Sequence, residues 1–316
     1  YYRKSKLMSI EFLKVLFLLC HTRSRWFYNR TDDAATAAMV FYSRIGRKKS
    51  IYALACDHDA EREKYKNLFG QIEYRNRRQK WFRMKDVSLL DAMIEWAKRN
   101  STLSFCQTQS QQRRFEANFG RRATIVPNSI QQADNALPPK ENIVLWVGNL
   151  RPIKQPELYL EIAHRLKQHN HWQFVMIGEP DETTLPLLKQ MENEPTFSFK
   201  GSLSYEQTQK WFSKSKVLIN TSIAEGFPNT FLQAWQAKCL VLSLNANPDN
   251  LLSNDGFGKV FDNNSNQMIE YLDKYLHNPE SVSHMLDKAL HYVTQQFDMS
   301  RNIEKIMIQI NNADRK

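Results

Sequence analysis

The chain has 316 residues, 42% of them hydrophobic, which fits a globular protein with room for two domains that each have a sizeable core. The four cysteines lie far apart, so their spacing excludes a cysteine-based metal site and indicates reduced thiols, as in cytosolic proteins. They are Cys20, Cys56, Cys106 and Cys239.

The formal net charge of +11 is concentrated in the first part of the chain. Residues 1–128 hold 26 Lys and Arg against 12 Asp and Glu, whereas the remainder hold 18 against 21. A basic first half indicates an anionic partner. The candidates are an acidic membrane surface, a phosphorylated lipid or polysaccharide acceptor, and nucleic acid. A solvated basic surface would explain the same counts.

Residues 7–20 form the first predicted element. A basic start followed by an apolar run resembles a signal peptide, but Glu11 and Lys14 interrupt the run and no small-residue cleavage site follows. The run is also too short and too charged to span a bilayer. The spacing therefore predicts an amphipathic helix packed on the core, with membrane contact as the alternative. Its expected core-facing residues are Ile10, Leu13, Phe17 and Cys20.

The rest of residues 1–128 alternates between strand and helix patterns, as in a doubly wound α/β domain. Strands are expected at 26–29, 51–56, 102–106 and 123–126, and helices at 34–43, 89–98 and 109–118. Residues 61–85 interleave Lys and Arg with aromatic residues. We interpret this stretch as a helical arm with an aromatic packing face; contact with an acidic membrane or an acceptor is the alternative. Nucleic acid is not expected, because no nucleic-acid motif accompanies the arm.

A second, more regular α/β domain is predicted at 143–316, after a linker at 129–142 that contains Pro138-Pro139. Strands are expected at 143–147, 172–177, 196–199, 216–220, 240–244 and 259–261, and helices at 156–167, 181–191, 205–213, 267–276, 279–294 and 300–311. Ser204 and Gln207 form a predicted capping box for the helix at 205–213. This order is typical of a Rossmann-like domain.

The stretch 216–244 is the most informative part of the sequence, because it reads as strand, loop, helix and strand. Asn229 or Thr230 is expected to cap the helix. The free backbone N–H groups of residues 229–231, together with the helix dipole, would bind an anion such as a diphosphate. Glu225 before this site and Gln233 inside the helix could accept hydrogen bonds from sugar hydroxyls. An ordinary βαβ crossover would show the same spacing.

The segment EGFPNTFLQAW, residues 225–235, resembles the signature of the family-4 retaining glycosyltransferases. The resemblance covers residues 143–311 well and 25–128 loosely. It implies the GT-B fold, an α/β architecture with two Rossmann-like doubly wound domains that face each other across a cleft. The family has a second Glu where this chain has Gln233, whose amide can still donate and accept hydrogen bonds.

The same resemblance assigns roles to residues around the donor. In WVGNLRPIKQP, residues 146–156, Lys154 and Arg151 would hold the donor diphosphate, although Asn149 stands where many members have Arg. Glu225 would bind the sugar hydroxyls and Gln233 the ribose, and 200–203 would lie beside the base. The full set expected to bind the donor is Gly148, Arg151, Lys154, Lys200, Gly201, Leu203, Glu225, Gly226, Phe227, Pro228, Asn229, Thr230 and Gln233.

Asp57-His58-Asp59 follows a predicted strand and allows three interpretations. The two carboxylates resemble the metal-binding DxD of the other large glycosyltransferase fold. Related GT-B enzymes instead bring a His near this strand end to the donor sugar, which makes His58 a candidate. A plain polar loop is the third interpretation. The expected catalytic residues are therefore Glu225, Lys154, Arg151 and His58, and no metal or other cofactor is expected.

The resemblance implies transfer of a hexose-type sugar from a nucleotide diphosphate sugar to an acceptor hydroxyl, with retention of configuration. The expected partners are the nucleotide sugar, a glycan or lipid-linked acceptor and an anionic membrane surface, with a cytoplasmic location on the inner face of a membrane. The alternatives are a nucleotide-sugar epimerase or hydrolase on the same fold and a non-catalytic membrane-associated scaffold. The first domain is expected to be incomplete, since the family's first strand and Gly-rich loop have no counterpart.

Overall fold

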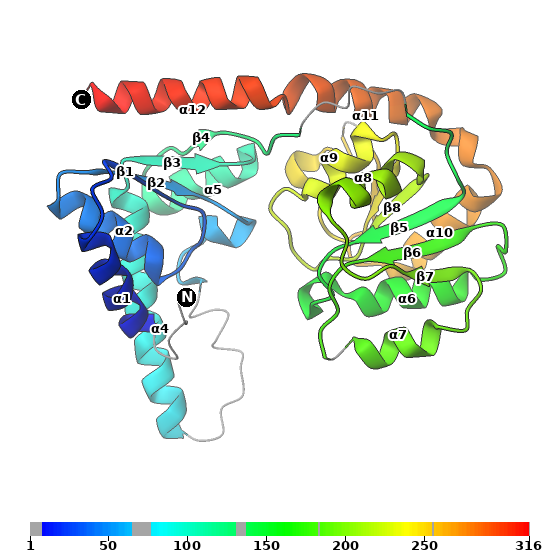
Figure 1. The fold of residues 1–316 in the computed structure, drawn as a ribbon, viewed down its shortest axis with the longest axis horizontal. Coiled ribbons are helices and arrows are strands. Elements are labelled where there is room, and N and C mark those ends of the chain that lie inside the picture. Colours follow the sequence, from blue (N-terminus) through cyan, green and yellow to red (C-terminus); the bar gives the residue numbers. More distant parts are fainter. Residues whose placement is uncertain (1–7, 65–76, 131–136, 183, 255, 316) are drawn as a thin grey trace. The chain divides into compact units, whose positions relative to one another are not determined.

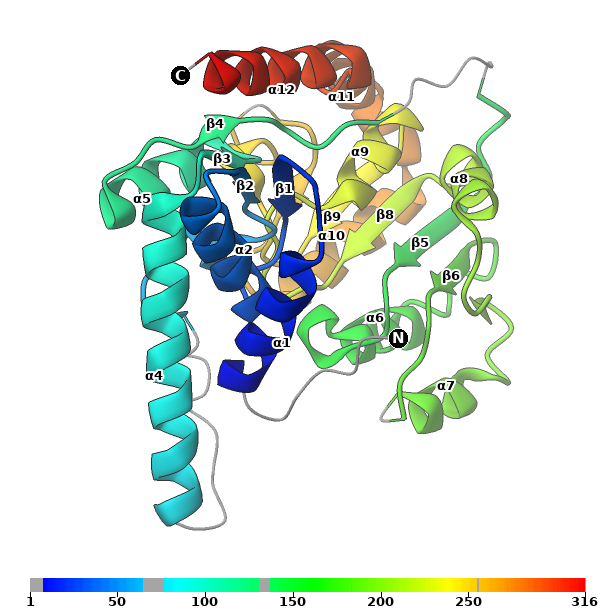
Figure 2. The ribbon, with the colours of Figure 1, turned by 60° about the vertical axis from the view of Figure 1, so that its left-hand side comes forward.

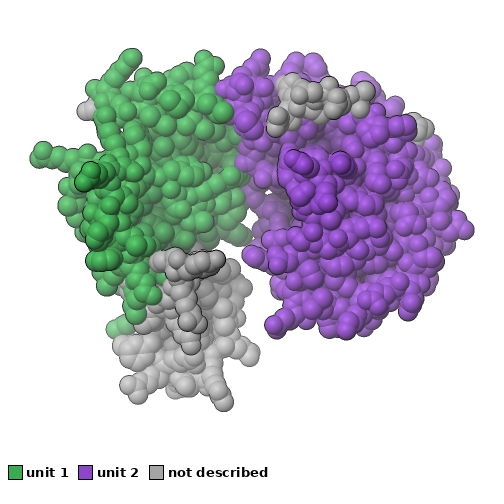
Figure 3. All heavy atoms as spheres, viewed as in Figure 1, with its two compact units in different colours: residues 1–127, 303–316 green, residues 128–302 purple. Residues whose placement is uncertain are grey.

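The computed structural model describes residues 8–64, 77–130, 137–182, 184–254 and 256–315. The chain divides into two compact units (Figure 3). Unit 1 comprises Tyr1–Pro127 with Ile303–Lys316, and unit 2 comprises Asn128–Asn302. The sequence placed everything from residue 143 to residue 316 in the second domain, whereas the last stretch of the chain groups with unit 1.

Unit 1 is built on a four-stranded parallel sheet in the order β1-β2-β3-β4. Its strands are β1 (Trp26–Asn29), β2 (Lys49–Ala53), β3 (Leu103–Cys106) and β4 (Thr124–Ile125). Its helices are α1 (Met8–Cys20), α2 (Ala34–Ile45), α4 (Arg77–Asn100), α5 (Gln109–Phe119) and most of α12 (Met299–Asp314), with the 3-10 turn η1 (Asp57–Ala60) (Figures 1 and 2). All four predicted strands are confirmed, and the helix predicted at 34–43 extends to Ile45, with Gly46 as its C-cap.

Helices cover both faces of this sheet. On one face α2 contacts α1 and α4, and α2 and α4 bury Ala37, Val40 and Ile94. On the other face α12 packs Ile306 and Ile310 against a buried group of strand residues. This packing explains why the C-terminal end of α12 belongs to unit 1.

The predicted orientation of α1 is wrong. Ile10, Leu13 and Phe17 are 41%, 62% and 67% exposed, while Phe12 and Leu19 pack against the cluster formed by α2 and α4. Since nearly every face of this helix carries apolar residues, helical spacing alone does not determine which stripe faces the core.

The basic and aromatic arm lies mostly outside the described residues: nothing is described at 65–76, and the side chains of 77–84 are not described either. The helix predicted at 89–98 proves much longer, because α4 begins at Arg77.

Unit 1 buries a network of charged side chains centred on Asp32. The Lys98 ammonium lies 2.8 Å from the Asp32 carboxylate, and both side chains are almost completely buried. The Tyr52 hydroxyl donates to the same carboxylate at 3.3 Å. The Lys64 ammonium lies 3.5 Å from Asp32 and also pairs with Asp59. Each buried charge therefore has a partner of opposite sign.

Unit 2 is built on a six-stranded parallel sheet in the order β10-β9-β8-β5-β6-β7. Its strands are β5 (Ile143–Val147), β6 (Gln173–Ile177), β7 (Phe197–Phe199), β8 (Val217–Asn220), β9 (Leu240–Ser243) and β10 (Lys259–Val260). Its helices are α6 (Pro156–Arg165), α7 (Leu185–Met191), α8 (Tyr205–Lys214), α9 (Asn229–Gln236), α10 (Ser265–His277) and α11 (Ser283–Gln296), and the start of α12 completes it. The Ser204–Gln207 capping box of α8 is confirmed.

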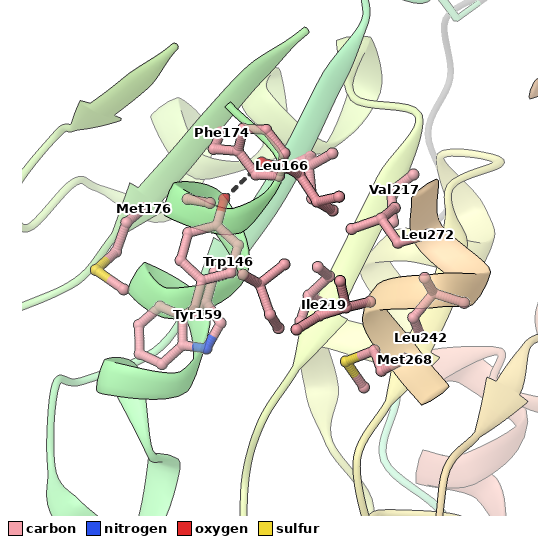
Figure 4. Packing of buried hydrophobic residues seen from close by; sticks show 14 of the residues in the cluster. Trp146, Tyr159, Leu166, Phe174, Met176, Val217, Ile219, Leu242, Met268 and Leu272 are labelled. Carbon is pink, nitrogen blue, oxygen red and sulfur yellow. Dashed lines mark hydrogen bonds between the residues drawn. The ribbon is translucent and has the colours of Figure 1, made fainter. Parts of the chain in front are cut away.

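Two apolar clusters fill the two faces of this sheet. Val144 and Trp146 of β5 face α6, α7 and α10, whereas Ile143 and Leu145 face α8, α9 and α11. Figure 4 shows the first cluster, in which the Tyr159 hydroxyl donates to the Val144 carbonyl at 2.7 Å. The alternation of inward faces along each strand makes unit 2 a three-layer α/β/α domain.

The strand order reverses between β5 and β8, which are adjacent in the sheet and parallel. From this pair the chain proceeds outward through β6 and β7 on one side and through β9 and β10 on the other. Ligands of open parallel sheets bind at such a switch point, outside the carboxyl ends of the strands. The loops after β5 and β8 are therefore the first place to look for a site. Within the described residues, no helix is long and apolar enough to cross a membrane.

Candidate functional site

The two loops at the switch point bring together opposite charges. The loop after β5 contains the 3-10 turn η2 (Pro152–Lys154), and the loop after β8 contains Glu225. The Lys154 ammonium and the Glu225 carboxylate form an ion pair, with side chains 31% and 16% exposed. The Ser222 hydroxyl donates to the same carboxylate at 2.7 Å. Two predicted donor-binding residues therefore meet, and both remain partly open to solvent.

Hydrogen bonds fix one loop against the other. The Thr221 hydroxyl donates to the Lys154 carbonyl at 2.6 Å, and the Ile223 N–H donates to the Ile153 carbonyl at 2.9 Å. Trp146 of β5 supports the contact, because its indole N–H donates to the Thr221 hydroxyl at 3.0 Å. Thr221 and Ser222 were not predicted as site residues, although hydroxyl residues directly after a buried strand were a signal for them.

Helix α9 begins at Asn229, four residues after Glu225, but its start differs from the prediction. The N-cap residue is Pro228, which makes no side-chain cap, so the expectation that Asn229 or Thr230 caps the helix is wrong. The Phe231 N–H is not free either, since it donates to the Pro228 carbonyl at 3.0 Å. The N–H groups of Asn229 and Thr230 have no intrahelical partner at these positions and remain available for an anion.

Asn128 holds the loop before α9. Its side-chain amide donates to the Phe227 carbonyl at 3.0 Å and to the Asn229 side-chain oxygen at 2.7 Å. This bond occupies the Asn229 side chain, which explains why that residue does not cap its own helix. The sequence had assigned Asn128 only to the end of the first domain, because a contact across a hundred residues leaves no local signal.

Glycines let the neighbouring strand ends approach closely. Gly178, after β6, has φ +155°, and a Cβ there would lie 1.7 Å from the Gly148 carbonyl oxygen. The Gly178 N–H donates to the Gly201 carbonyl at 2.9 Å, and the Gly148 N–H donates to the Ile177 carbonyl at 3.0 Å. Gly148 and Gly201, predicted separately, are thus joined at one sheet edge by Gly178, to which the sequence assigned no role.

The other predicted donor-binding residues do not join the ion pair, and those at 200–203 lie in a third loop, between β7 and α8. Arg151 is exposed and makes no side-chain hydrogen bond within the described part of unit 2. Gln233 is half-buried on α9. The Lys200 ammonium lies 5.2 Å from the centre of the Trp211 ring, and Leu203 packs against the apolar cluster below α8 and α9. Their roles toward a ligand stay predictions.

His58 lies in unit 1, on η1 after β2, and is exposed. Asp57 accepts hydrogen bonds from Gln111 at 2.9 Å and Arg114 at 2.8 Å. Asp59 is buried and accepts from two backbone N–H groups and from Lys64. Burial raises the pKa of Asp59, but the Lys64 ammonium and the N–H donors outweigh it and hold the pKa below its usual range. Because protein donors already use both carboxylates, the geometry does not favour the metal interpretation.

A different group could supply metal ligands. Among the described residues, ligand atoms of His169, Asp273 and His277 lie within 4.8 Å of one another. The His169 Nε2 and an Asp273 carboxylate oxygen are 2.7 Å apart, so a hydrogen bond already joins these two atoms. His169 precedes β6, at the sheet edge opposite the ion pair. The group is therefore separate from the candidate site.

Solved structures with this fold include glycosyltransferases and enzymes that bind UDP-sugars. A mutant of S. aureus TarM in complex with Fondaparinux, alpha-GlcNAc-glycerol and UDP has a TM-score of 0.72 and 16% identity, over 95% of this chain and 59% of TarM. Anabaena HepE in complex with UDP-glucose has a TM-score of 0.71 and 15% identity, over 95% of this chain and 82% of HepE. Sucrose-phosphate synthase from Thermosynechococcus elongatus has a TM-score of 0.72 and 14% identity, over 99% of this chain and 81% of the synthase. The chain thus spans less than two thirds of TarM.

These likenesses confirm the predicted GT-B fold class. No curated protein matches the sequence. The sequence profile of the family described as "Glycosyl transferases group 1" matches residues 128–291, which is more than half of the chain and contains both loops of the switch point. The chain therefore belongs to the group 1 glycosyl transferases.

Proposed function

We propose that unit 2 binds a nucleotide diphosphate sugar at its switch point and that the protein transfers a hexose-type sugar to an acceptor hydroxyl with retention, as in the family-4 enzymes. The observation that carries the proposal is the Lys154–Glu225 ion pair beside the start of α9. The ion pair and the helix start that follows it in the sequence supply a cation, a carboxylate and free backbone N–H groups. These are the groups needed by a ligand with a diphosphate on one side and hydroxyls on the other.

Each group has a distinct role toward the donor. The negative charge of the diphosphate is stabilised by the Lys154 ammonium and by the N–H groups of Asn229 and Thr230. Arg151 supplies a second cation. The Glu225 carboxylate, oriented by Ser222, accepts hydrogen bonds from sugar hydroxyls. Lys154 can serve the diphosphate while it stays near Glu225, because an ammonium has three donors. Gln233 binds the ribose, and the loop from Lys200 to Leu203 lies beside the base.

The reaction breaks the bond between the anomeric carbon and the diphosphate oxygen and forms a bond from that carbon to the acceptor oxygen. The negative charge that develops on the leaving diphosphate is stabilised by the cations and N–H groups already in place. The acceptor proton passes to the leaving phosphate, so no protein nucleophile is required. The family resemblance makes His58 the candidate for contact with the donor sugar, and the proposed reaction uses neither a metal nor another cofactor.

The acceptor is a glycan, a lipid-linked sugar or a surface polysaccharide. The strongly basic first 128 residues favour an anionic acceptor or an anionic membrane surface. HepE and TarM, which share the fold, were solved with UDP-glucose and with UDP, and this supports a nucleotide sugar as the donor here.

A thermal-shift titration of the whole chain with UDP, GDP and ADP tests the donor site. A ligand that binds only the folded protein stabilises it by about 2.7 kcal/mol at roughly 100 times its Kd. We expect one nucleotide to raise Tm by several degrees, and Lys154→Ala to remove that shift because the diphosphate loses its cation. Glu225→Ala should keep much of the nucleotide shift and lose the additional shift given by the complete nucleotide sugar.

Lys189→Ala is the matched control, since Lys189 is an exposed lysine of unit 2 on α7, away from both switch-point loops. Absence of a shift with all three nucleotides, or an equal shift in Lys154→Ala, would contradict the donor site. Incubation with donor alone then distinguishes a transferase from an epimerase or hydrolase, and NMR of the product anomer tests retention.

A further inference from the structure

A pocket of about 530 Å³ lies in unit 1, at the edge of the sheet opposite η1 and His58. Its walls come from the turn between α2 and β2 and from the turn between α4 and β3. Arg121, from the stretch after α5, also lines it. Since the strands are parallel, these turns lie at the amino ends of β2 and β3, whereas His58 follows the carboxyl end of β2. The pocket is therefore separate from the position proposed for His58 in sugar transfer.

The lining of this pocket carries one sign of charge. Six of its residues are cationic, and the other four are uncharged Ser, Thr and Asn residues. The cationic residues are Arg44, Arg47, Lys48, Lys49, Arg99 and Arg121. A concave surface of one sign focuses the field and raises the local concentration of counter-ions.

Several of these cations also have a structural role. The Arg121 guanidinium donates to carbonyls at the end of α4, including that of Arg99 at 3.0 Å. The Lys48 ammonium donates to the Thr22 carbonyl at 3.0 Å, and the Lys49 ammonium donates to the Ala313 carbonyl at 2.8 Å. Positive charge at helix C-termini complements the helix dipole. These contacts hold three cations in place but neutralise none of them.

Arg44 and Arg47 have no such explanation. Within the described part of unit 1 neither side chain makes a hydrogen bond or an ion pair, and both are exposed at the pocket. The pKa of Arg121 is lowered by burial and, next, by the positive charge of Arg44, so the cations repel one another. Arg99 has one weak ion pair, 3.7 Å from Glu95 in the preceding turn of α4. The pocket thus retains uncompensated positive charge.

We infer that this pocket binds a phosphoryl group with two or more negative charges, through Arg44, Arg47 and Arg99. Guanidinium forks match phosphate oxygens in bidentate geometry, and several of them around one pocket suit a multivalent anion better than a single carboxylate. The same phosphoryl chemistry occurs in a soluble phosphorylated ligand and in the headgroup of an anionic lipid. The site does not depend on the donor pocket of unit 2.

The test uses the whole chain and inorganic pyrophosphate as the probe. Because pyrophosphate could also enter the proposed donor site, binding is measured by thermal shift in Lys154→Ala as well as in the unmodified chain. We expect pyrophosphate to raise Tm in both, and Arg44→Ala/Arg47→Ala to weaken pyrophosphate binding about tenfold or more. All titrations are made at constant ionic strength, so that the weaker binding of pyrophosphate cannot come from screening by added salt.

Lys85→Ala/Arg113→Ala is the matched control, since it removes two exposed positive charges of unit 1 that do not line the pocket. Equal pyrophosphate binding by the two double variants, or no binding by the unmodified chain, would overturn the inference. Arg44→Ala/Arg47→Ala should keep the nucleotide shift of the donor site, which separates failure of this inference from failure of the proposed function.

Vesicles then identify the source of the phosphoryl group. Sedimentation of the chain with phosphatidylcholine vesicles, with and without phosphatidic acid, is compared between the two double variants. Pocket-dependent sedimentation supports a lipid headgroup, whereas pocket-dependent binding of pyrophosphate alone supports a soluble ligand. Binding that is indifferent to Arg44 and Arg47 in both arms contradicts the site.

Discussion

The interiors of the two units differ in charge. Among the described residues, the buried Asp, Glu, Lys and Arg side chains all belong to unit 1. They are Asp32, Asp59, Asp91, Glu95 and Lys98. The interior of unit 2 holds two large apolar clusters, and the charges of its candidate site lie at the sheet edge, partly open to solvent. Unit 1 therefore depends on satisfied charge pairs, and unit 2 on buried apolar area.

The difference shows how the same α/β plan can be stabilised in two ways. Unit 1 has smaller apolar clusters and a shorter sheet, and three of its five buried charged residues, Asp91, Glu95 and Lys98, belong to helix α4. Such pairs contribute little net stability compared with apolar packing, yet removing one partner is strongly destabilising because an uncompensated charge remains buried. In unit 2 we instead expect the unfolding free energy to fall when a buried apolar side chain is shortened, and to change less when a charge is removed.

The largest expected effect is that of Lys98→Met in unit 1. This change removes the closest cation from the fully buried Asp32 carboxylate, while the Tyr52 hydroxyl and the more distant Lys64 ammonium remain. We expect unit 1 to lose about 3–5 kcal/mol of unfolding free energy. Hydrogen exchange of peptides from β2 and β3 measures the loss, while peptides from β8 and β9 report on unit 2.

The double variant Asp32→Asn/Lys98→Met is the control, because it removes both charges and keeps an acceptor for the Tyr52 hydroxyl. It should recover much of the loss. If Lys98→Met alone changes protection in β2 and β3 by less than about 0.5 kcal/mol, the charge network does not stabilise unit 1 and the comparison fails.

In unit 2 the corresponding change is Leu272→Ala. Leu272 is fully buried on α10 in the first apolar cluster (Figure 4). Its truncation should reduce the unfolding free energy by about 3 kcal/mol, from the lost apolar area and the cavity left behind. Hydrogen exchange of β8 and β9 peptides is the readout.

Leu272→Met is the matched control and should lose less than about 1.5 kcal/mol, because it conserves volume. Equal losses in the two variants would show that shape, rather than buried volume, limits this cluster.

The smallest expected effect is on the pH dependence of stability and comes from the buried Cys239 thiol of unit 2. The thiol donates to the Ser215 carbonyl at 3.0 Å, and the Lys140 ammonium lies 3.7 Å from its sulfur. Burial raises the pKa of the Cys239 thiol to about 11. The unfolded thiol ionises first as pH rises, so the stability contributed by this group is present below the unfolded pKa and is lost as pH approaches the folded pKa.

We expect the unfolding free energy to fall by about 1.4 kcal/mol more between pH 8 and pH 10 in the unmodified chain than in Cys239→Ser. Urea unfolding at the two pH values measures the difference. Burial lowers the pKa of Lys140, whose contribution has the opposite sign, but Lys140 is present in both chains. Identical pH profiles would show that Cys239 does not titrate in this way.

Much of the fold was predictable because it depends on local patterns. Buried parallel strands appear as short apolar runs, as in Ile143–Val147, and helix ends carry caps such as Ser204 with Gln207. The orientation of α1 was not predictable, since its sequence offers more than one apolar stripe and only its neighbours select between them.

The candidate site was predictable only in part. Glu225 and Lys154 stood out by their motifs, and the structure joins them in one ion pair. Asn128 and Gly178 were missed, because the first acts through a contact with residues 227–229 and the second through its approach to Gly148. Neither contact leaves a periodic or local signal in the sequence.

The sequence by itself therefore determined the α/β class, the strand order along the chain and the family, because these depend on periodicity and on one contiguous motif. Only the tertiary structure decided where β5 and β8 become neighbours and thereby which loops share a site. It also decided that the positive charges of two distant turns converge on one pocket of unit 1. Strand pairing and charge convergence are long-range properties, set by packing rather than by any local stretch of residues.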